Sequence, residues 1–151
     1  MQRGVFAAAL SALLASVCSA QSDLRQVDDE ALRNAANSPD EWITIGRDHA
    51  ETRFSPLRQI NSDNVNRLGL AWSYDPGSLR GLEATTLVSN GVLYATADWS
   101  NVFALDARTG RELWRWDAKA DRIRGARACC DVVNRGVALY KGKGYVGVID
   151  G

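Results

Sequence analysis

Two adjacent cysteines, Cys129 and Cys130, carry the most distinctive chemistry of this 151-residue chain, whose only other cysteine is Cys18. If the adjacent pair oxidises within the chain, the two must bond to each other. Consecutive Cα atoms lie only about 3.8 Å apart across a trans peptide, whereas an ordinary disulfide spans roughly 4.4–6.8 Å. Such a bridge closes almost no loop, so it gains little chain-entropy stabilisation. A strained bond that stabilises little indicates a functional role.

Residues 1–20 have the pattern of a secretory signal peptide, with Arg3, an apolar run over 5–15 and small residues up to Ala20. The run is shorter than the ~20 residues that cross a bilayer. We expect cleavage after Ala20. The alternative is a lipid anchor on Cys18, which the bulky Val17 before it disfavours. Export removes Cys18 and brings the remaining pair into a compartment where disulfides persist.

Other interpretations of the cysteine pair remain open. The two thiols can stay reduced and pack as small apolar side chains, or they can act as a redox sensor that alternates between thiols and disulfide. A metal site has less support, because no spacing offers four ligands and the single histidine, His49, is expected in an exposed loop. Asp131 is expected to form a turn beside the pair.

The composition argues against several function classes. Lys plus Arg and Asp plus Glu both number 18 and are interspersed, so neither a nucleic-acid-binding surface nor an acidic tail is indicated. No CxxCH haem motif and no further apolar span is found in the sequence. The roughly 130 residues after the leader suffice for one ordinary domain.

The elements that must position these cysteines are mostly strands. A short helix capped by Asp28 or Asp29 is predicted before Pro39. After residue 41, short apolar runs alternate with turn residues, and Asn90-Gly91 is a strong hairpin signal, with a further turn over 107–110. This pattern predicts an all-β domain with strands over 68–74, 85–88, 92–96, 101–106, 113–117, 136–140 and 145–149.

An internal repeat suggests how the strands are grouped. Gly91 and Tyr94 align with Gly142 and Tyr145, 51 residues later, and Trp72 aligns with Trp114, 42 residues later. Periods of about 40–50 residues with four short strands each are typical of β-propeller blades. An open sandwich with two similar hairpins is the alternative.

Two motifs resemble one known family. ALDARTGRELW, over 104–114, is similar to the tryptophan-docking motif of the quinoprotein alcohol dehydrogenases, which use pyrroloquinoline quinone (PQQ). CCDVVNRG, over 129–136, resembles the segment in which that family carries a vicinal disulfide against the face of the quinone. Residues 41–75 look like the opening of the family's first blade. The resemblance implies an eight-bladed propeller, in which each docking Trp pins one blade to the next, and a disulfide between Cys129 and Cys130.

The resemblance also implies the cofactor contacts. Glu83, in GLEAT, matches a glutamate that hydrogen-bonds the quinone, and Arg135 matches an arginine that pairs with one of its three carboxylates. Val133 is a weaker candidate contact. Thr86, where the family commonly has proline, and Gly144, in a usually apolar strand position, depart from the pattern without touching these contacts.

The expected organisation is a signal peptide over 1–20, a helical extension over 21–40 and about two blades of a truncated propeller over 41–151. By resemblance, the parent enzyme is periplasmic, oxidises alcohols to aldehydes and passes electrons to a c-type cytochrome. Its catalytic residues, its calcium or lanthanide ligands and any haem c domain are expected beyond Gly151. The alternatives are a cofactor-free propeller scaffold and the redox sensor above.

Overall fold

The computed structural model describes residues 24–151. The predicted signal peptide, its cleavage after Ala20 and the alternative anchor at Cys18 lie outside these residues. Within the described range, the longest helix is five residues, and no helix meets the length and hydropathy that crossing a membrane requires.

The N-terminal extension is tied to the first sheet. Helix α1 (Asp29–Arg33) begins where the Asp28 carboxylate accepts the Ala31 N–H at 2.9 Å, so Asp28 is the cap, and a 3-10 turn, η1 (Ala35–Asn37), follows. Further on, Trp42 exchanges two backbone hydrogen bonds with Val88 at 2.8 and 2.9 Å. The extension therefore lies along the outer edge of the sheet, where it buries a small apolar cluster of its own.

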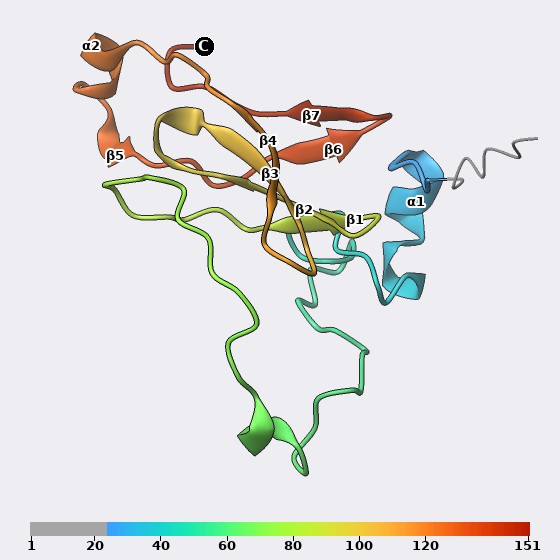
Figure 1. Cartoon of the computed structure of the whole chain (residues 1–151). Helices are drawn as coiled ribbons and strands as arrows, with labels where there is room; N and C mark the ends of the chain where they lie inside the picture. The colour runs from blue at the N-terminus through green and yellow to red at the C-terminus, as the bar shows by residue number, and fades with distance from the viewer. Residues whose placement is uncertain (1–23) are drawn as a thin grey trace, which may run out of the picture.

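One antiparallel sheet dominates the fold (Figure 1). Its strands follow chain order: β1 (Leu87–Ser89), β2 (Val92–Thr96), β3 (Val102–Asp106) and β4 (Glu112–Trp116). Asn90 and Gly91 both have positive φ, as a tight hairpin turn requires, so the predicted Asn-Gly hairpin is confirmed. Four short antiparallel strands in sequence order form a sheet of the propeller-blade type.

A second, smaller sheet follows a crossover. The chain leaves β4, forms α2 (Arg122–Gly125) and β5 (Cys129–Val132), and then enters the hairpin of β6 (Ala138–Tyr140) and β7 (Lys143–Tyr145). The 3-10 turn η3 (Asp98–Ser100) lies between β2 and β3 and contacts β5. The cysteines therefore lie on the connection between the two sheets (Figure 1).

The predicted strand over 68–74 is wrong. The segment follows a 3-10 turn, η2 (Val65–Arg67), and no strand among the described residues pairs with its backbone. Leu68 and Leu70 are 59% and 86% exposed, whereas Trp72 and Tyr74 pack against the core of the main sheet. An apolar run predicts a strand, but a strand forms only where a neighbour accepts its backbone hydrogen bonds.

Several boundaries also differ from the prediction. The first strand begins at Leu87 because the Thr85 N–H donates to the Arg135 carbonyl instead of a sheet neighbour, at 3.2 Å. The last strand is 143–145 rather than 145–149, and Gly144 pairs with Leu139. The short elements α2 and β5 were not predicted, because neither has a clear periodic pattern.

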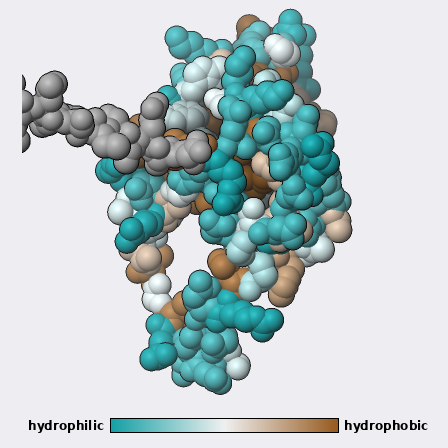
Figure 2. All heavy atoms as spheres, turned by 90° about the vertical axis from the view of Figure 1, so that its right-hand side faces the viewer, coloured by the Kyte–Doolittle hydropathy of each residue, from teal (hydrophilic) through white to brown (hydrophobic). Residues whose placement is uncertain are grey.

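A long excursion over 51–72 leaves the body of the molecule and returns (Figure 1). Figure 2 shows it as a separate lobe at the bottom, below a face that is mostly hydrophilic with apolar atoms recessed in its middle. The excursion exposes large apolar side chains, namely Phe54, Leu57, Ile60, Val65, Leu68 and Leu70.

Candidate functional site

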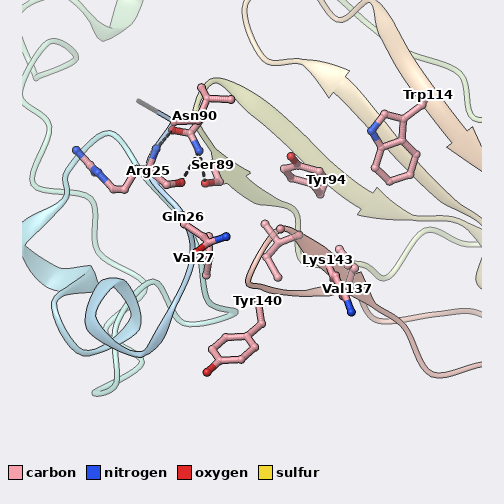
Figure 3. Close-up of a pocket in the computed structure, with 14 residues that line it drawn as sticks. Arg25, Gln26, Val27, Ser89, Asn90, Tyr94, Trp114, Val137, Tyr140 and Lys143 are labelled. Atoms are coloured by element: carbon pink, nitrogen blue, oxygen red, sulfur yellow. Dashed lines mark hydrogen bonds between the residues drawn. The ribbon is translucent and has the colours of Figure 1, made fainter. Parts of the chain in front are cut away.

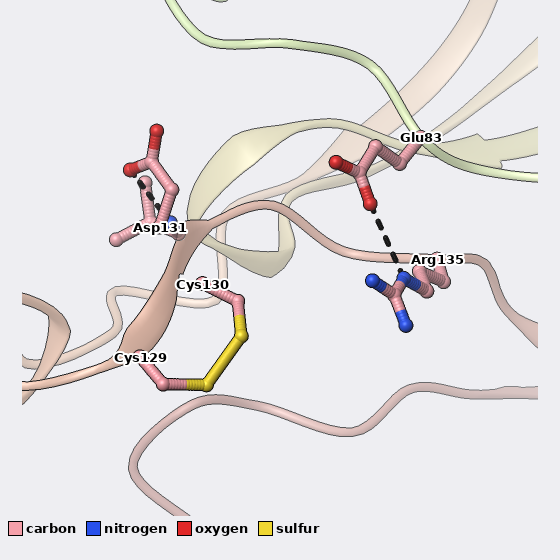
Figure 4. Close-up of a disulfide and its surroundings, with 6 residues drawn as sticks. Glu83, Cys129, Cys130, Asp131 and Arg135 are labelled. Atoms are coloured by element: carbon pink, nitrogen blue, oxygen red, sulfur yellow. Dashed lines mark hydrogen bonds and ion pairs between the residues drawn. A yellow bond between two sulfur atoms is a disulfide. The ribbon is translucent and has the colours of Figure 1, made fainter.

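Cys129 and Cys130 form a vicinal disulfide, with their Cα atoms 3.8 Å apart (Figure 4). This confirms the predicted bond. Both cysteines are exposed, whereas Val132, at the end of the same strand, is buried. The described chain therefore presents a compact, weakly polar disulfide ring on its surface.

Asp131 fixes the turn of the chain after the disulfide. Its φ of 66° lies in the left-handed region, which Asp tolerates better than most residues. One carboxylate oxygen accepts the Val132 N–H at 2.8 Å, and the other accepts from Arg80 Nη1 at 3.2 Å. Asp131 thus takes the left-handed conformation expected of a turn former, although it lies within β5.

The structure brings Glu83 and Arg135 together, although they are 52 residues apart in sequence. The Arg135 Nε–H donates to Glu83 Oε2 at 3.2 Å, and the two side chains point toward one another (Figure 4). The Glu83 side chain is 46% exposed and the Arg135 side chain is 76% exposed. Among residues 24–151, the terminal nitrogens of Arg135 make no hydrogen bond, so they remain available to an anion.

Asn134 anchors this segment and was missed by the sequence reasoning. Its side-chain amide donates to Ser100 Oγ at 3.1 Å and to the Gly147 carbonyl at 2.9 Å, and its backbone carbonyl accepts from Thr96 Oγ1 at 3.3 Å. One residue therefore links the main sheet, the site segment and the chain after β7. The only sequence signal for this role was the position of Asn134 directly before the candidate residue Arg135.

A hollow of about 380 Å³ lies beside Arg135. Its lining includes Ile45, Thr85, Leu87, Asn134, Arg135 and Tyr145 but neither cysteine and not Glu83. Val133 is half-buried, and His49 is exposed as expected. Of the candidate cofactor contacts, Arg135 lines this hollow while Glu83 and both cysteines lie outside it, so they do not share one closed pocket.

A second hollow, of about 360 Å³, separates the main sheet from the β6–β7 hairpin (Figure 3). The aromatic rings of Tyr94 and Trp114 line it, with centroids 6.1 Å apart. Burial, and secondarily Glu41, raises the pKa of Tyr94 above its usual 10.0. Trp114 and Trp116 also line a neighbouring hollow with Val137, just before β6, and Gly144 of β7. Trp114 of the docking motif and the nearby Trp116 therefore face the interface between the two sheets.

The turn of the same motif receives a different tryptophan. Trp72 donates its indole N–H to the Ala107 carbonyl at 3.3 Å, and its ring lies against Gly110. Gly110 has φ +70°, and a Cβ there would lie 2.5 Å from Trp72 Cε3. The turn of the docking motif thus binds Trp72, from the chain that precedes the sheet. Trp114, the motif's own Trp, faces the β6–β7 hairpin.

The sequence analysis also did not predict a polar cluster that lies next to the excursion. The Tyr74 hydroxyl donates to Glu112, and Arg115 donates to the Tyr74 oxygen, to Glu112 and, at 2.8 Å, to the Pro76 carbonyl. The hydrogen bond from Tyr74 lowers the pKa of Glu112, and burial raises the pKa of Tyr74. This cluster fastens the chain that follows the excursion to β4.

The disulfide and Arg135 offer the chemistry that one side of a planar anion requires. The disulfide offers a flat apolar surface, and the free end of the Arg135 fork offers paired N–H donors for a carboxylate. Within the described part of the chain, no group of three or more His, Cys, Asp or Glu residues is placed to hold a metal ion. The arrangement can therefore bind and orient part of such a ligand.

Comparisons with known proteins identify relatives of this chain. The chain is 56% identical over 133 residues to the quinohemoprotein alcohol dehydrogenase of Comamonas testosteroni, covering 87% of this chain and 19% of that protein. It is 58% identical over 111 residues to the 1-butanol dehydrogenase (cytochrome c) of Thauera butanivorans, covering 74% and 16%. The structure of quinohemoprotein alcohol dehydrogenase ADHIIG from Pseudomonas putida HK5 matches with a TM-score of 0.79 and 52% identity, covering 82% of this chain and 18% of that one.

The chain thus spans about a fifth of the length of the curated relatives it matches. Residues 42–147 match the family described as "PQQ: Glucose/ethanol/alcohol dehydrogenase, beta-propeller domain". This range contains the docking motif, the vicinal disulfide and the Glu83–Arg135 pair. The chain therefore belongs to the PQQ-dependent alcohol dehydrogenase β-propeller family.

Proposed function

We propose that this chain is the N-terminal part of a PQQ-dependent alcohol dehydrogenase that oxidises alcohols to aldehydes and passes electrons to a c-type cytochrome. Its family membership and the names of its relatives support the alcohol substrate, and the name of the Thauera butanivorans relative, 1-butanol dehydrogenase (cytochrome c), supports the cytochrome. The observation that carries the proposal is an exposed vicinal disulfide in the same short segment as Arg135, which is paired with Glu83.

Each residue has a defined part in binding. Cys129 and Cys130 supply a rigid, weakly polar surface for a planar ring. Arg135 donates its terminal N–H groups to a carboxylate, while Glu83 accepts from Nε and orients the fork. Bound PQQ supplies the quinone that accepts hydride from the alcohol, and the protein supplies binding and orientation. Val133 is a further contact in this proposal.

The remaining parts of the enzyme are assigned to residues beyond this chain. They comprise the calcium or lanthanide ligands, the base that takes the alcohol proton, the opposite face of the quinone site and, in a quinohaemoprotein, a haem c domain. Within the chain, we assign 1–20 to a signal peptide, 21–40 to the extension and 41–151 to the first part, about two blades, of an eight-bladed propeller. An exported, periplasmic location is consistent with a persistent disulfide.

The proposal is tested on the full-length gene product, produced with PQQ and calcium. We expect quinone absorbance in the purified protein and alcohol-dependent reduction of a dye. Replacing both cysteines by serine, Cys129→Ser with Cys130→Ser, should impair PQQ-dependent turnover. Absence of both quinone absorbance and activity in the unmodified protein would refute the proposal.

The exposure of the disulfide keeps a redox sensor as a second candidate. A sensor is expected to alternate between dithiol and disulfide when the solution potential changes, and its function would not require PQQ. A serine variant that loses redox response while PQQ-dependent turnover is unchanged would favour the sensor. Loss of PQQ-dependent turnover favours the dehydrogenase.

A further inference from the structure

Two segments that are distant in sequence are joined by two ion pairs next to the disulfide. Arg80 Nη1 lies 3.2 Å from Asp131 Oδ2, and Arg135 Nε lies 3.2 Å from Glu83 Oε2. The Thr85 N–H donates to the Arg135 carbonyl, also at 3.2 Å. The contacts advance in the same direction along both segments, so 80–85 runs beside 131–135. Of these four side chains, the resemblance assigns cofactor contacts to Glu83 and Arg135 only.

Asp131 turns the chain between the disulfide and the buried end of β5. It separates the exposed Cys130 from the buried Val132, and its φ of 66° turns the chain between them. A left-handed conformation is unfavourable for most L-residues and needs local support. Asp131 receives that support from the Val132 N–H on one oxygen and from Arg80 on the other. Arg80 thus contacts Asp131 from a distant part of the chain, next to the disulfide.

We propose that the Arg80–Asp131 ion pair positions the vicinal disulfide so that its face is presented to the quinone. Arg80 is a positioning residue, because its side chain hydrogen-bonds only Asp131 among the described residues. The inference rests on the proposed function for the identity of the ligand. The orientation of the disulfide by Arg80 does not depend on that ligand and is measured separately.

The chain offers a matched control for Arg80. Arg25 is 52% exposed, as is Arg80, and forms an ion pair with Asp40 at 3.8 Å, away from the disulfide. Arg80→Ala and Arg25→Ala therefore remove similar exposed arginines. Asp131→Asn removes the charge but keeps an oxygen for the Val132 N–H and a residue that tolerates positive φ. The double variant Arg80→Ala with Asp131→Asn shows whether the two side chains act together.

Two readouts are made on the full-length protein purified without cofactor. The first is the Kd for PQQ, from titration in the presence of calcium. The second, which needs no ligand, is the hydrogen-exchange rate of the peptide that contains residues 129–133. We expect Arg80→Ala and Asp131→Asn each to weaken PQQ binding and to speed this exchange by about fivefold, the effect of one exposed ion pair. The double variant should add little, and Tm should stay equal to that of Arg25→Ala.

The outcomes separate this inference from the proposed function. If Arg80→Ala matches Arg25→Ala in both the PQQ Kd and the exchange rate, the positioning role is wrong. A drop in Tm with faster exchange throughout the protein also overturns it, because Arg80 would then support the fold in general. If the unmodified protein binds no PQQ but Arg80→Ala still speeds exchange at 129–133 alone, the proposed function fails and the positioning of the disulfide stands.

Discussion

At the scale of single residues, the candidate site depends on side chains that use only part of their hydrogen-bonding capacity. Arg135 binds Glu83 through Nε and leaves its terminal nitrogens free within the described residues. This arrangement fixes the plane of the guanidinium before a ligand arrives. A fork that is already oriented loses less conformational freedom on binding than a free side chain.

Arg135→Lys tests the fork itself. Lysine keeps the charge but cannot bind Glu83 and a carboxylate in the same planar geometry. We expect PQQ affinity of the full-length protein to fall about tenfold or more, the effect of losing a charged hydrogen bond. Arg124→Lys is the control, since Arg124 also uses Nε in an exposed ion pair, with Asp121 at 3.9 Å. Equal affinities of the two variants would contradict the role of Arg135.

Asp106 gives a prediction about pH. Its carboxylate accepts hydrogen bonds at the turn after β3, from the Thr109 N–H at 2.9 Å and the Arg108 N–H at 3.0 Å, and the contact with Thr109 is the main cause of its lowered pKa. Because the folded pKa is below the usual 3.8, the carboxylate stabilises the fold above that pH, and this contribution is lost as the pH falls through the folded value. We expect Asp106→Asn to lower Tm at neutral pH, with a difference that shrinks below pH 3.8. A difference that is constant with pH would contradict this assignment.

At the scale of elements, local signals predicted local structure. The Asn90-Gly91 turn and the strands β2 and β3 form where they were expected, because a hairpin turn and its flanking strands are encoded by neighbouring residues. The strand over 68–74 was mispredicted because pairing depends on a distant partner. The element β5 was missed because its sequence, CCDV, has no clear alternation of polar and apolar residues.

Gly110 and Gly91 form a matched pair for testing the docking of Trp72. Both have positive φ, 70° and 73°, but only Gly110 faces a neighbour that an added Cβ would meet, at 2.5 Å. Both substitutions by alanine carry the cost of a left-handed residue, about 1–2 kcal/mol. We expect Gly110→Ala to reduce the free energy of unfolding by at least 1 kcal/mol or so more than Gly91→Ala, because Trp72 must shift. Chemical denaturation of both variants measures the difference, and equal losses would show that Trp72 docking contributes little.

At the scale of the whole molecule, the two sheets, the excursion and the segment that follows it expose large apolar side chains. Leu70 and Leu79 are 86% and 97% exposed, and Trp114 and Trp116 are each nearly half exposed at the face toward the β6–β7 hairpin. Apolar area of this kind marks interaction surfaces or a risk of aggregation. In a closed propeller, such faces are covered by neighbouring blades.

We therefore expect this chain, expressed by itself, to self-associate and to bind a hydrophobic dye, whereas the full-length protein should do neither. Light scattering after size-exclusion chromatography measures the association. Leu70→Ser combined with Leu79→Ser should reduce it, and Arg25→Ala, which changes no apolar surface, is the control. A monomeric chain without dye binding would show that the exposed faces cover one another in solution.

The sequence by itself determined the chemistry of the site and its family. The adjacent cysteines, the docking motif, Glu83 and Arg135 were all recognisable, because each is defined by residue type and short spacing. Tertiary structure alone decided that Glu83 meets Arg135, that Arg80 holds Asp131 and that Trp72 docks on Gly110. These contacts join segments that lie 38 to 52 residues apart, and such pairings are set by how the whole chain packs and not by local patterns of residues.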